Sequence, residues 1–303
     1  MRAILRGVLC LFFGISSAVL AQDAVLKPFV LGSKGPGEVA QAVEVAKTKL
    51  TQNGFTIAGS YSPYPNATVI AVTNDEMRST AAKSEHGGFG AAQRVSVTKV
   101  GNDVQVAYTN PIYMANAYRM AGDLKETAAK LQAALGKVED FGAKGLTASQ
   151  LRKYHYTFGM EYFDEPNEFV KYASYEEAVK AVEAGLAAGK QGVTKVVPRR
   201  CRRQEGDAVR RRHEGRGRSR QEHGRQVHHE RDRLQGHQST AHLPYDILVS
   251  DNKVYALYAR FRIAISFPDL SMMGANSFMN IMKSPEAIRE ALALTSGGKK
   301  DAR

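Results

Sequence analysis

The chain has 303 residues, of which 43% are hydrophobic, and its formal net charge is +12. This length is enough for two hydrophobic cores of ordinary size. Residues 198–238 contribute +7 of the charge and the first twenty-one residues +2, so the remainder gives no argument for an anionic partner. Each of these two segments holds one of the two cysteines, which excludes a disulfide framework in the rest of the chain.

The first twenty-one residues predict a secretory signal peptide. Arg2 and Arg6 precede the apolar run Gly7–Leu20, and Ala21 completes a small-residue cleavage pattern before Gln22. The apolar run is too short to span a membrane comfortably, and no later segment reaches eighteen apolar residues. We therefore expect an exported chain without a membrane span, periplasmic or extracellular after cleavage near Ala21.

Residues 24–137 predict a first α+β unit, a small antiparallel sheet with helices packed on it in the order β-α-β-β-β-β-α. The helix Glu38–Leu50 places its apolar residues three and four positions apart. The closing helix Leu124–Leu135 follows Asp123, which we expect to be its N-cap. The expected strands are Val25–Leu31, Phe55–Tyr61, Thr68–Val72 and the hairpin arms Arg94–Val100 and Val104–Tyr108.

After a linker at residues 138–151, residues 152–297 repeat this order and residues 298–303 form a tail. Lys153–Phe163 is expected to be extended, and Ser174 is expected to cap the helix Tyr175–Leu186. The remaining elements are the strand Val193–Val197, the hairpin arms Tyr245–Val249 and Val254–Tyr258, and a closing helix with Ser284 as N-cap and Pro285 as first residue. The two hairpins align at a constant offset of 150, which indicates an internal duplication.

The segment Val104–Met120, VQVAYTNPIYMANAYRM, carries a resemblance to a known family. A strand that runs into Tyr-Thr-Asn-Pro and then an alanine-rich segment resembles the signature of domain of unknown function 302. The resemblance covers about residues 27–137 and implies a compact α+β fold, but the family offers no agreed activity or catalytic residues. The second unit departs from it, because Arg260 and Phe261 replace Asn110 and Pro111.

Residues 198–238 differ from the rest of the chain, with 13 of its 23 Arg, 5 of its 8 His and no Lys. One interpretation is a basic arm that binds nucleic acid. The other is a compensated pair of frameshifts, since reading Val209–Glu214 or Val227–Gly236 one nucleotide later permits apolar, strand-like residues. A nucleic-acid arm would mix Lys with Arg and interleave aromatic residues. We favour the frameshift, expect no nucleic-acid partner, and expect an irregular span beside a sheet that lacks a strand.

The candidate ligand-binding residues follow a strand end and a glycine-rich connection. Asn110, Pro111, Tyr113 and Tyr118 could orient a small ligand, although Pro111 could equally end the strand while the tyrosines pack on the core. His86 opens the stretch His86–Gly90, whose backbone could approach a ligand or form a plain turn. No catalytic residue, metal ligand or cofactor is predicted.

Three functions remain open at this point. The leading hypothesis is a non-enzymatic binding module, with a small molecule as a candidate partner and a homodimer as a candidate assembly. An enzyme with a site between the two units is the first alternative. The second is a Cu(I) binder, because thioethers are soft ligands, with core packing as the competing explanation of the methionines Met272, Met273, Met279 and Met282.

Overall fold

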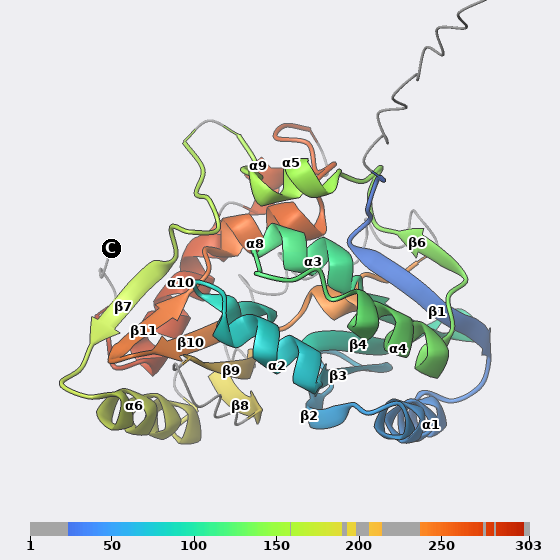
Figure 1. Ribbon diagram of the computed structural model, residues 1–303, viewed down its shortest axis with the longest axis horizontal. Coiled ribbons are helices and arrows are strands. Elements are labelled where there is room, and N and C mark those ends of the chain that lie inside the picture. The colour runs from blue at the N-terminus through green and yellow to red at the C-terminus, as the bar shows by residue number, and fades with distance from the viewer. Residues whose placement is uncertain are drawn as a thin grey trace, which may run out of the picture.

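Two antiparallel sheets with helices packed on them make up the computed structural model (Figure 1). The structure describes residues 24–157, 159–189, 193–197, 206–213, 237–274, 277–281 and 283–299. The fold class is therefore the mixed α+β class that the sequence predicts. Within the part of the chain described, no helix is long and apolar enough to cross a membrane.

The first sheet has the strand order β2-β3-β4-β5-β1-β6. Its elements are β1 (Phe29–Pro36), α1 (Val39–Gln52), β2 (Thr56–Tyr61), β3 (Ala67–Thr73), α2 (Asp75–Ala82), the 3₁₀ helix η1 (Gly87–Gly90), β4 (Gln93–Val100), β5 (Asp103–Thr109), α3 (Pro111–Ala117), α4 (Lys125–Leu135), β6 (Glu139–Phe141) and α5 (Ala148–Arg152). The second sheet has the order β7-β11-β10-β9-β8. Its elements are β7 (Asn167–Lys171), α6 (Tyr175–Ala187), β8 (Val193–Val197), β9 (Gly206–His213), the 3₁₀ helix η3 (Thr240–His242), β10 (Asp246–Ser250), β11 (Lys253–Ala256), α8 (Ala259–Ser266), α9 (Phe278–Ile281) and α10 (Lys283–Thr295).

The two sheets share one topology. We call the described residues up to Arg152 the first half of the protein and those from Lys153 onward the second half. If β6 is set aside, the strand order of each sheet is the second, third, fourth, fifth and then first strand of its half. Bulges also fall at corresponding strand pairs. One interrupts β1 against β5 and β7 against β11, and another interrupts β2 against β3 and β8 against β9. Figure 1 shows the sheets side by side, with α1 and α6 below them.

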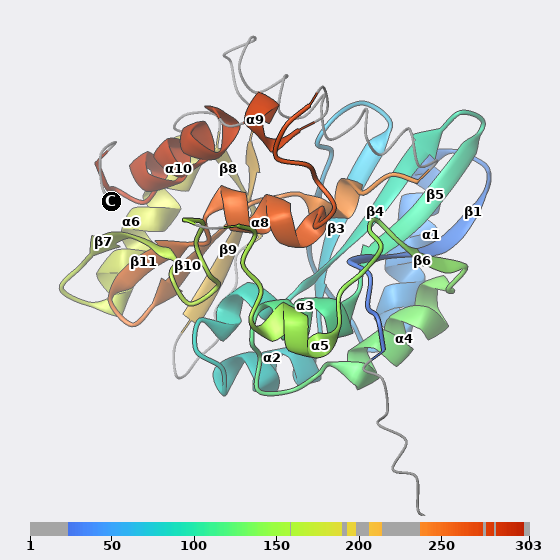
Figure 2. The ribbon, with the colours of Figure 1, turned by 90° about the horizontal axis from the view of Figure 1, so that it is seen from above.

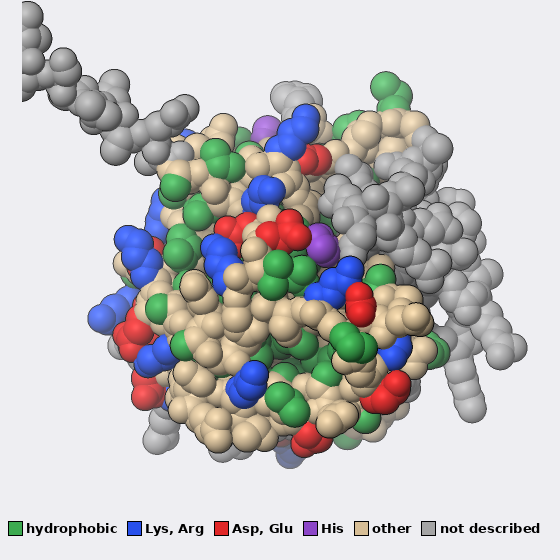
Figure 3. Space-filling view, turned by 90° about the vertical axis from the view of Figure 1, so that its right-hand side faces the viewer, with side chains coloured by type: hydrophobic (Ala, Val, Ile, Leu, Met, Phe, Trp, Pro, Cys, Tyr) green, Lys and Arg blue, Asp and Glu red, His purple; other side chains and the backbone are tan. Residues whose placement is uncertain are grey.

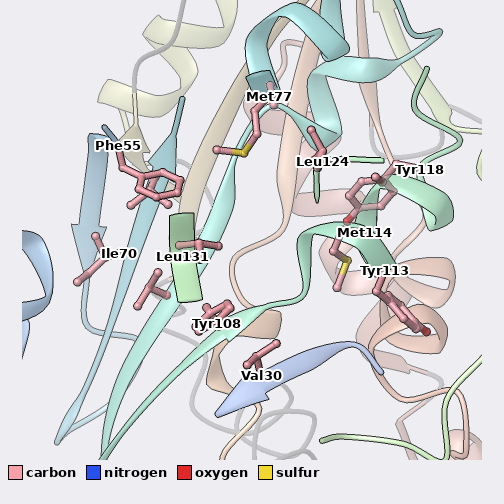
Figure 4. Packing of buried hydrophobic residues seen from close by; sticks show 14 of the residues in the cluster. Val30, Phe55, Ile70, Met77, Tyr108, Tyr113, Met114, Tyr118, Leu124 and Leu131 are labelled. Carbon is pink, nitrogen blue, oxygen red and sulfur yellow. The ribbon is translucent and has the colours of Figure 1, made fainter. Parts of the chain in front are cut away.

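The central strands β3, β4 and β5 of the first sheet are buried on both faces, and their side chains alternate between these faces with the period of two of a β-strand. Val30 and Tyr108 belong to the cluster that α1 and α4 cover, whereas Phe29, Leu31 and Ala107 belong to a different cluster. Figure 4 shows Val30, Ile70 and Tyr108 near Leu131 of α4. The helix-covered face of this sheet is therefore an ordinary apolar core.

The other face of the first sheet is largely polar and is covered by the second half. Arg94, Ser96, Thr98 and Gln105 are all buried there. Thr98 Oγ1 donates to Thr240 Oγ1 at 3.2 Å, and Gln105 Oε1 accepts from the backbone N–H of Gln238 at 3.2 Å. Conversely, the 3₁₀ helix η1 of the first half lies against the strands β9 and β10 of the second sheet. The halves thus cover one another reciprocally.

The main hydrophobic core crosses the boundary between the halves. Leu248, Leu257, Phe261 and Ile265 of the second half are part of the cluster that holds most of the first half's apolar residues. Helices α3 and α8 meet near the middle of the molecule, as Figure 2 shows from above. A separate cluster packs β10 and β11 against α6 and α10. Apolar contacts therefore stabilise the boundary between the halves as well as the interior of each half, at about 25 cal/mol for each Å² of apolar surface that is buried.

Several elements differ from the sequence prediction. The first strand starts at Phe29 and runs to Pro36. The described residues of the 153–163 segment form no strand, so that β7 is the first strand of the second half. The span assigned to a linker contains β6 and α5. The expected β-α-β-β-β-β-α order also lacks the helices α2 and α3.

Two helix starts and one strand require correction. Leu124, in a left-handed conformation, precedes α4, and Asp123 instead accepts from the backbone N–H of Lys125. Helix α10 begins at Lys283, so Ser284 is already helical. The prediction of an irregular span beside an incomplete sheet is wrong for Gly206–His213, which form β9 between β8 and β10.

The signal segment and the rest of the Arg-rich run, except His237 and Gln238, lie outside the described residues.

Candidate ligand-binding groove

Asn110 and Pro111 form the beginning of helix α3. The Asn110 side-chain oxygen accepts from the backbone N–H groups of Ile112 at 3.1 Å and Tyr113 at 3.4 Å, which is an N-cap. Its amide nitrogen donates to the carbonyl oxygen of Lys27 at 3.0 Å. Pro111 occupies the first helical position, where its missing N–H is not needed. Both polar groups of the Asn110 side chain are therefore used inside the protein.

Tyr113 and Tyr118 are core residues of the boundary between the halves. Tyr113 is fully buried, and its hydroxyl donates to the carbonyl oxygen of Ile265 in α8 at 2.8 Å. Burial, with smaller effects of Tyr154, Asp269 and Tyr118, raises the pKa of the Tyr113 hydroxyl well above its usual value. The Tyr118 ring packs on Phe163 at a centroid distance of 5.5 Å. These tyrosines contact protein where the sequence hypothesis places a ligand.

His86 lies at the boundary between the halves, where it contacts Tyr255 of the second half. Its backbone is left-handed, with φ of 49°, and its ring meets the Tyr255 ring edge-on at 5.1 Å. Burial lowers the pKa of the His86 imidazole, against the opposing effect of the Glu85 and Asp164 carboxylates. None of the contacts described for His86 joins it to Asn110, Pro111, Tyr113 or Tyr118.

A groove with a volume of about 390 Å³ opens in the first half, between α1 and the end of β1. Figure 3 shows the face that carries it, with a hollow floored by hydrophobic side chains and with charged side chains around it. The lining residues are Ser33, Lys34, Gly35, Pro36, Gly37, Glu38, Gln41, Ala42, Val45, Ala46, Lys49, Val104, Val106 and Leu135.

The groove lies beyond the bulge of β1, where the strand, still paired with β5, runs on toward α1. The bulge in β1 falls at Gly32, where an added Cβ would lie 2.8 Å from the carbonyl oxygen of Leu135, so only glycine lets the strand approach α4 this closely. Beyond the bulge β1 continues to Pro36, and Gly37, with φ of 154° and no atom near its Cβ position, turns the chain into α1. The connection therefore forms one wall of the groove and α1 the opposite wall.

The groove combines an apolar floor with a charged rim. Ala46, Val104 and Val106 are buried under it, whereas Val45 remains 48% exposed on the α1 wall. Val45 therefore extends the apolar floor onto the exposed α1 wall.

The charges at the rim are nearly balanced. Lys34 Nζ lies 3.5 Å from Asp103 Oδ2, and Lys99 Nζ lies 3.3 Å from Glu38 Oε1. Lys49, on the α1 wall, has no ion-pair partner among the residues that the structure describes. Two of the three lysines are thus paired with a carboxylate, and the charge of Lys49 is left without a counter-charge in the described structure.

The equivalent position of the second half is packed against a helix end. Lys49 is the eleventh residue of α1, and the eleventh residue of α6 is Gly185. A Cβ at Gly185 would lie 1.9 Å from the carbonyl oxygen of Thr295, the last residue of α10, so the two helices touch there. In the first half the last residue of α4 is Leu135, which instead lines the groove.

The groove is not among the sites that the sequence predicts. One feature of the sequence does point to it, since Lys49 and Gly185 occupy the same position of the otherwise similar helices α1 and α6. No group of three or more His, Cys, Asp or Glu side chains in the described part of the chain is arranged to hold a metal ion.

No protein-family model matches this chain, and no curated protein matches it. The resemblance to domain of unknown function 302 therefore stays a prediction from the sequence, and any functional conclusion depends on the geometry of the molecule itself.

Proposed function

We propose that the protein is a non-enzymatic binding protein that holds a small molecule with an apolar body in the groove of its first half. The observation that carries this proposal is a concave surface with a buried apolar floor and an exposed apolar wall. Small-molecule sites occupy roughly 300–1,000 Å³ and are lined mainly by apolar groups with a few polar ones. The groove, at about 390 Å³, falls at the lower end of that range.

The test is direct titration of the whole protein with decanol and decanoate, below their aggregation concentrations, by isothermal titration calorimetry. We expect at least one of them to bind, because an alkyl chain can cover the floor at about 0.8 kcal/mol for each buried methylene group. Failure of both to bind at concentrations up to their solubility limits would contradict the proposal.

A matched pair of variants locates the binding site. Ala42→Phe places an aromatic ring in the groove, since Ala42 is half-buried in its lining. Thr48→Phe adds the same ring on an exposed position of the same helix outside the lining. We expect Ala42→Phe to weaken binding at least tenfold and Thr48→Phe to leave it unchanged. Equal affinities in the two variants would place the ligand elsewhere.

Cu(I) binding is a second candidate function, favoured by the loop before α9. Met273 and Met279 are 79% and 51% exposed, which is unusual for large apolar side chains. The backbone N–H of Met279 donates to the carbonyl oxygen of Met272 at 3.2 Å, so the two residues are adjacent in space. Thioethers are suitable ligands for Cu(I). Titration of Cu(I) against a chromogenic chelator tests this candidate, with Met272→Leu/Met279→Leu expected to lose binding and the buried control Met77→Leu to keep it.

We also propose that the chain is exported after cleavage near Ala21, that it arose by internal duplication, and that its units belong to the family of domain of unknown function 302. The common strand order and the corresponding bulges of the two sheets support the duplication. Mass spectrometry of protein recovered from the periplasm or the medium tests export, since cleavage would leave Gln22 at the N-terminus. A mature mass that retains the first twenty-one residues would contradict it.

A further inference from the structure

We infer that the ligand of the groove is an amphipathic anion, an apolar chain or ring system with one carboxylate or similar group, and that Lys49 determines this specificity. The inference rests on the proposed function and adds the charge of the ligand to it. The two probes named above have chains of the same length and differ in the end group, a neutral hydroxyl against an anionic carboxylate, so the two proposals can fail separately.

The balance of charges around the groove carries the first step. The carboxylates of Asp103 and Glu38 each have a lysine within 4 Å, namely Lys34 and Lys99. Lys99 also donates to the carbonyl oxygen of Gly37 at 2.6 Å, which fixes its ammonium group at the outer side of the connection. Lys49 remains as the one lining cation without an ion-pair partner in the described structure. An anionic ligand would supply that partner.

The position of Lys49 carries the second step. It lies on the same wall as Val45 and Ala46, so a ligand that covers these two side chains would bring its end group near the Lys49 ammonium. Water is partly excluded beside the apolar floor, and an ion pair gains strength as the local dielectric constant falls. A neutral ligand would gain the apolar contact but not the ion pair.

The second half provides an internal comparison. Where α6 has Gly185 in place of Lys49, the end of α10 packs directly on the helix. The cation and the groove therefore occur together in the first half, and the equivalent position of the second half has a glycine under a helix end. This association links Lys49 to the groove and distinguishes it from a lysine whose only role is solubility.

The experiment compares decanoate with decanol on wild type, Lys49→Gln and Lys47→Gln. Lys47 is the matched control, because it lies on the same helix outside the groove lining, paired with Glu44 at 2.9 Å. We expect Lys49→Gln to weaken decanoate binding about two- to fivefold, the size of a solvent-screened ion pair. Decanol affinity should be unchanged in both variants, and Lys47→Gln should bind both probes as wild type does.

The salt dependence gives a second measurement on the same proteins. Decanoate affinity of the wild type should fall when sodium chloride is raised from 0.05 M to 0.5 M, whereas that of Lys49→Gln should fall less. If decanol and decanoate bind wild type equally, or if Lys49→Gln loses both equally, the inference is overturned while the binding function stands. If neither probe binds any variant, the proposed function itself fails.

Discussion

Arg94 of β4 and Asp246 of β10 form an ion pair across the boundary between the two halves, with both side chains only 2% exposed. Asp246 also accepts from Arg262 at 2.9 Å, so one carboxylate serves two guanidinium groups. Arg262 in turn donates to the carbonyl oxygen of His242 at 2.7 Å. A buried network of this kind holds two surfaces in one relative position, because any other arrangement would leave charges unpaired.

The first prediction concerns this network. Asp246→Ala should lower the free energy of unfolding by about 3–5 kcal/mol, because it leaves Arg94 and Arg262 buried without their carboxylate. Arg94→Met should cost less, since Asp246 keeps Arg262. Urea unfolding followed by circular dichroism measures both. Glu168→Gln, at the exposed pair with Lys253, is the control and should change stability by less than about 1 kcal/mol. Equal effects of Asp246→Ala and Glu168→Gln would refute the role assigned to the network.

The second prediction concerns the contact between α6 and α10. Gly185→Ala should destabilise the protein by about 1–3 kcal/mol, because its Cβ would overlap the carbonyl oxygen of Thr295 and force the helices apart. Gly35→Ala is the matched control, since no atom lies within 4 Å of the Cβ position there. Thermal unfolding of both variants provides the measurement, and a Gly185→Ala protein as stable as wild type would contradict the close contact.

The third prediction concerns pH. Burial lowers the pKa of His86 in the folded protein below that of an unfolded chain, so the unfolded state binds the proton more readily as the pH falls. The contribution of His86 to stability is therefore complete above the unfolded pKa, near 6.5, and is lost as the pH falls through the lower folded value. Wild type should lose stability between about pH 7.5 and pH 5, and His86→Asn should lose less. Asparagine suits the comparison because it tolerates the left-handed backbone at this position. Parallel pH curves for the two proteins would show that His86 does not titrate in this way.

The fourth prediction separates the cap of α3 from ligand binding. Asn110→Ala should cost about 1 kcal/mol of stability through loss of the N-cap. It should leave the dissociation constants of decanol and decanoate unchanged, since Asn110 does not line the groove. Calorimetry on the folded variant is the measurement. A large loss of affinity with little loss of stability would return Asn110 to the ligand-binding residues that the sequence suggested.

Local sequence patterns predicted the elements that depend on local chemistry. The apolar spacing of α1 and the Ser174 cap of α6 are found in the structure as expected, and so are the turns of both hairpins. The aromatic residues of Lys153–Phe163 suggest a strand, but they pack in irregular backbone: Phe163 contacts Tyr118 and Phe261, and Tyr156 contacts Phe278. Aromatic content indicates burial, and only the tertiary contacts decide which element is buried.

The candidate site could not be predicted in the same way. Asn110, Pro111 and Tyr113 follow a strand end, which is a common place for sites, but the sequence does not reveal that the second half covers them through Ile265. The groove depends on the bulge at Gly32 and on the distance between α1 and the end of α4, neither of which a single segment encodes. Long-range packing thus concealed one surface and created the other.

Residues 237–246 cover the first sheet and belong to the same chain as that sheet. Assembly of the two halves is therefore independent of protein concentration. Two separate polypeptides with these surfaces would meet only at a rate set by dilution, whereas a covalent connection keeps each half at a high effective concentration near the other. A cut in the 138–151 segment would remove that advantage, and the buried Arg94, Ser96, Thr98 and Gln105 would then be exposed to water whenever the pieces separated. Unbroken connectivity is therefore a condition for a persistent folded state in dilute solution.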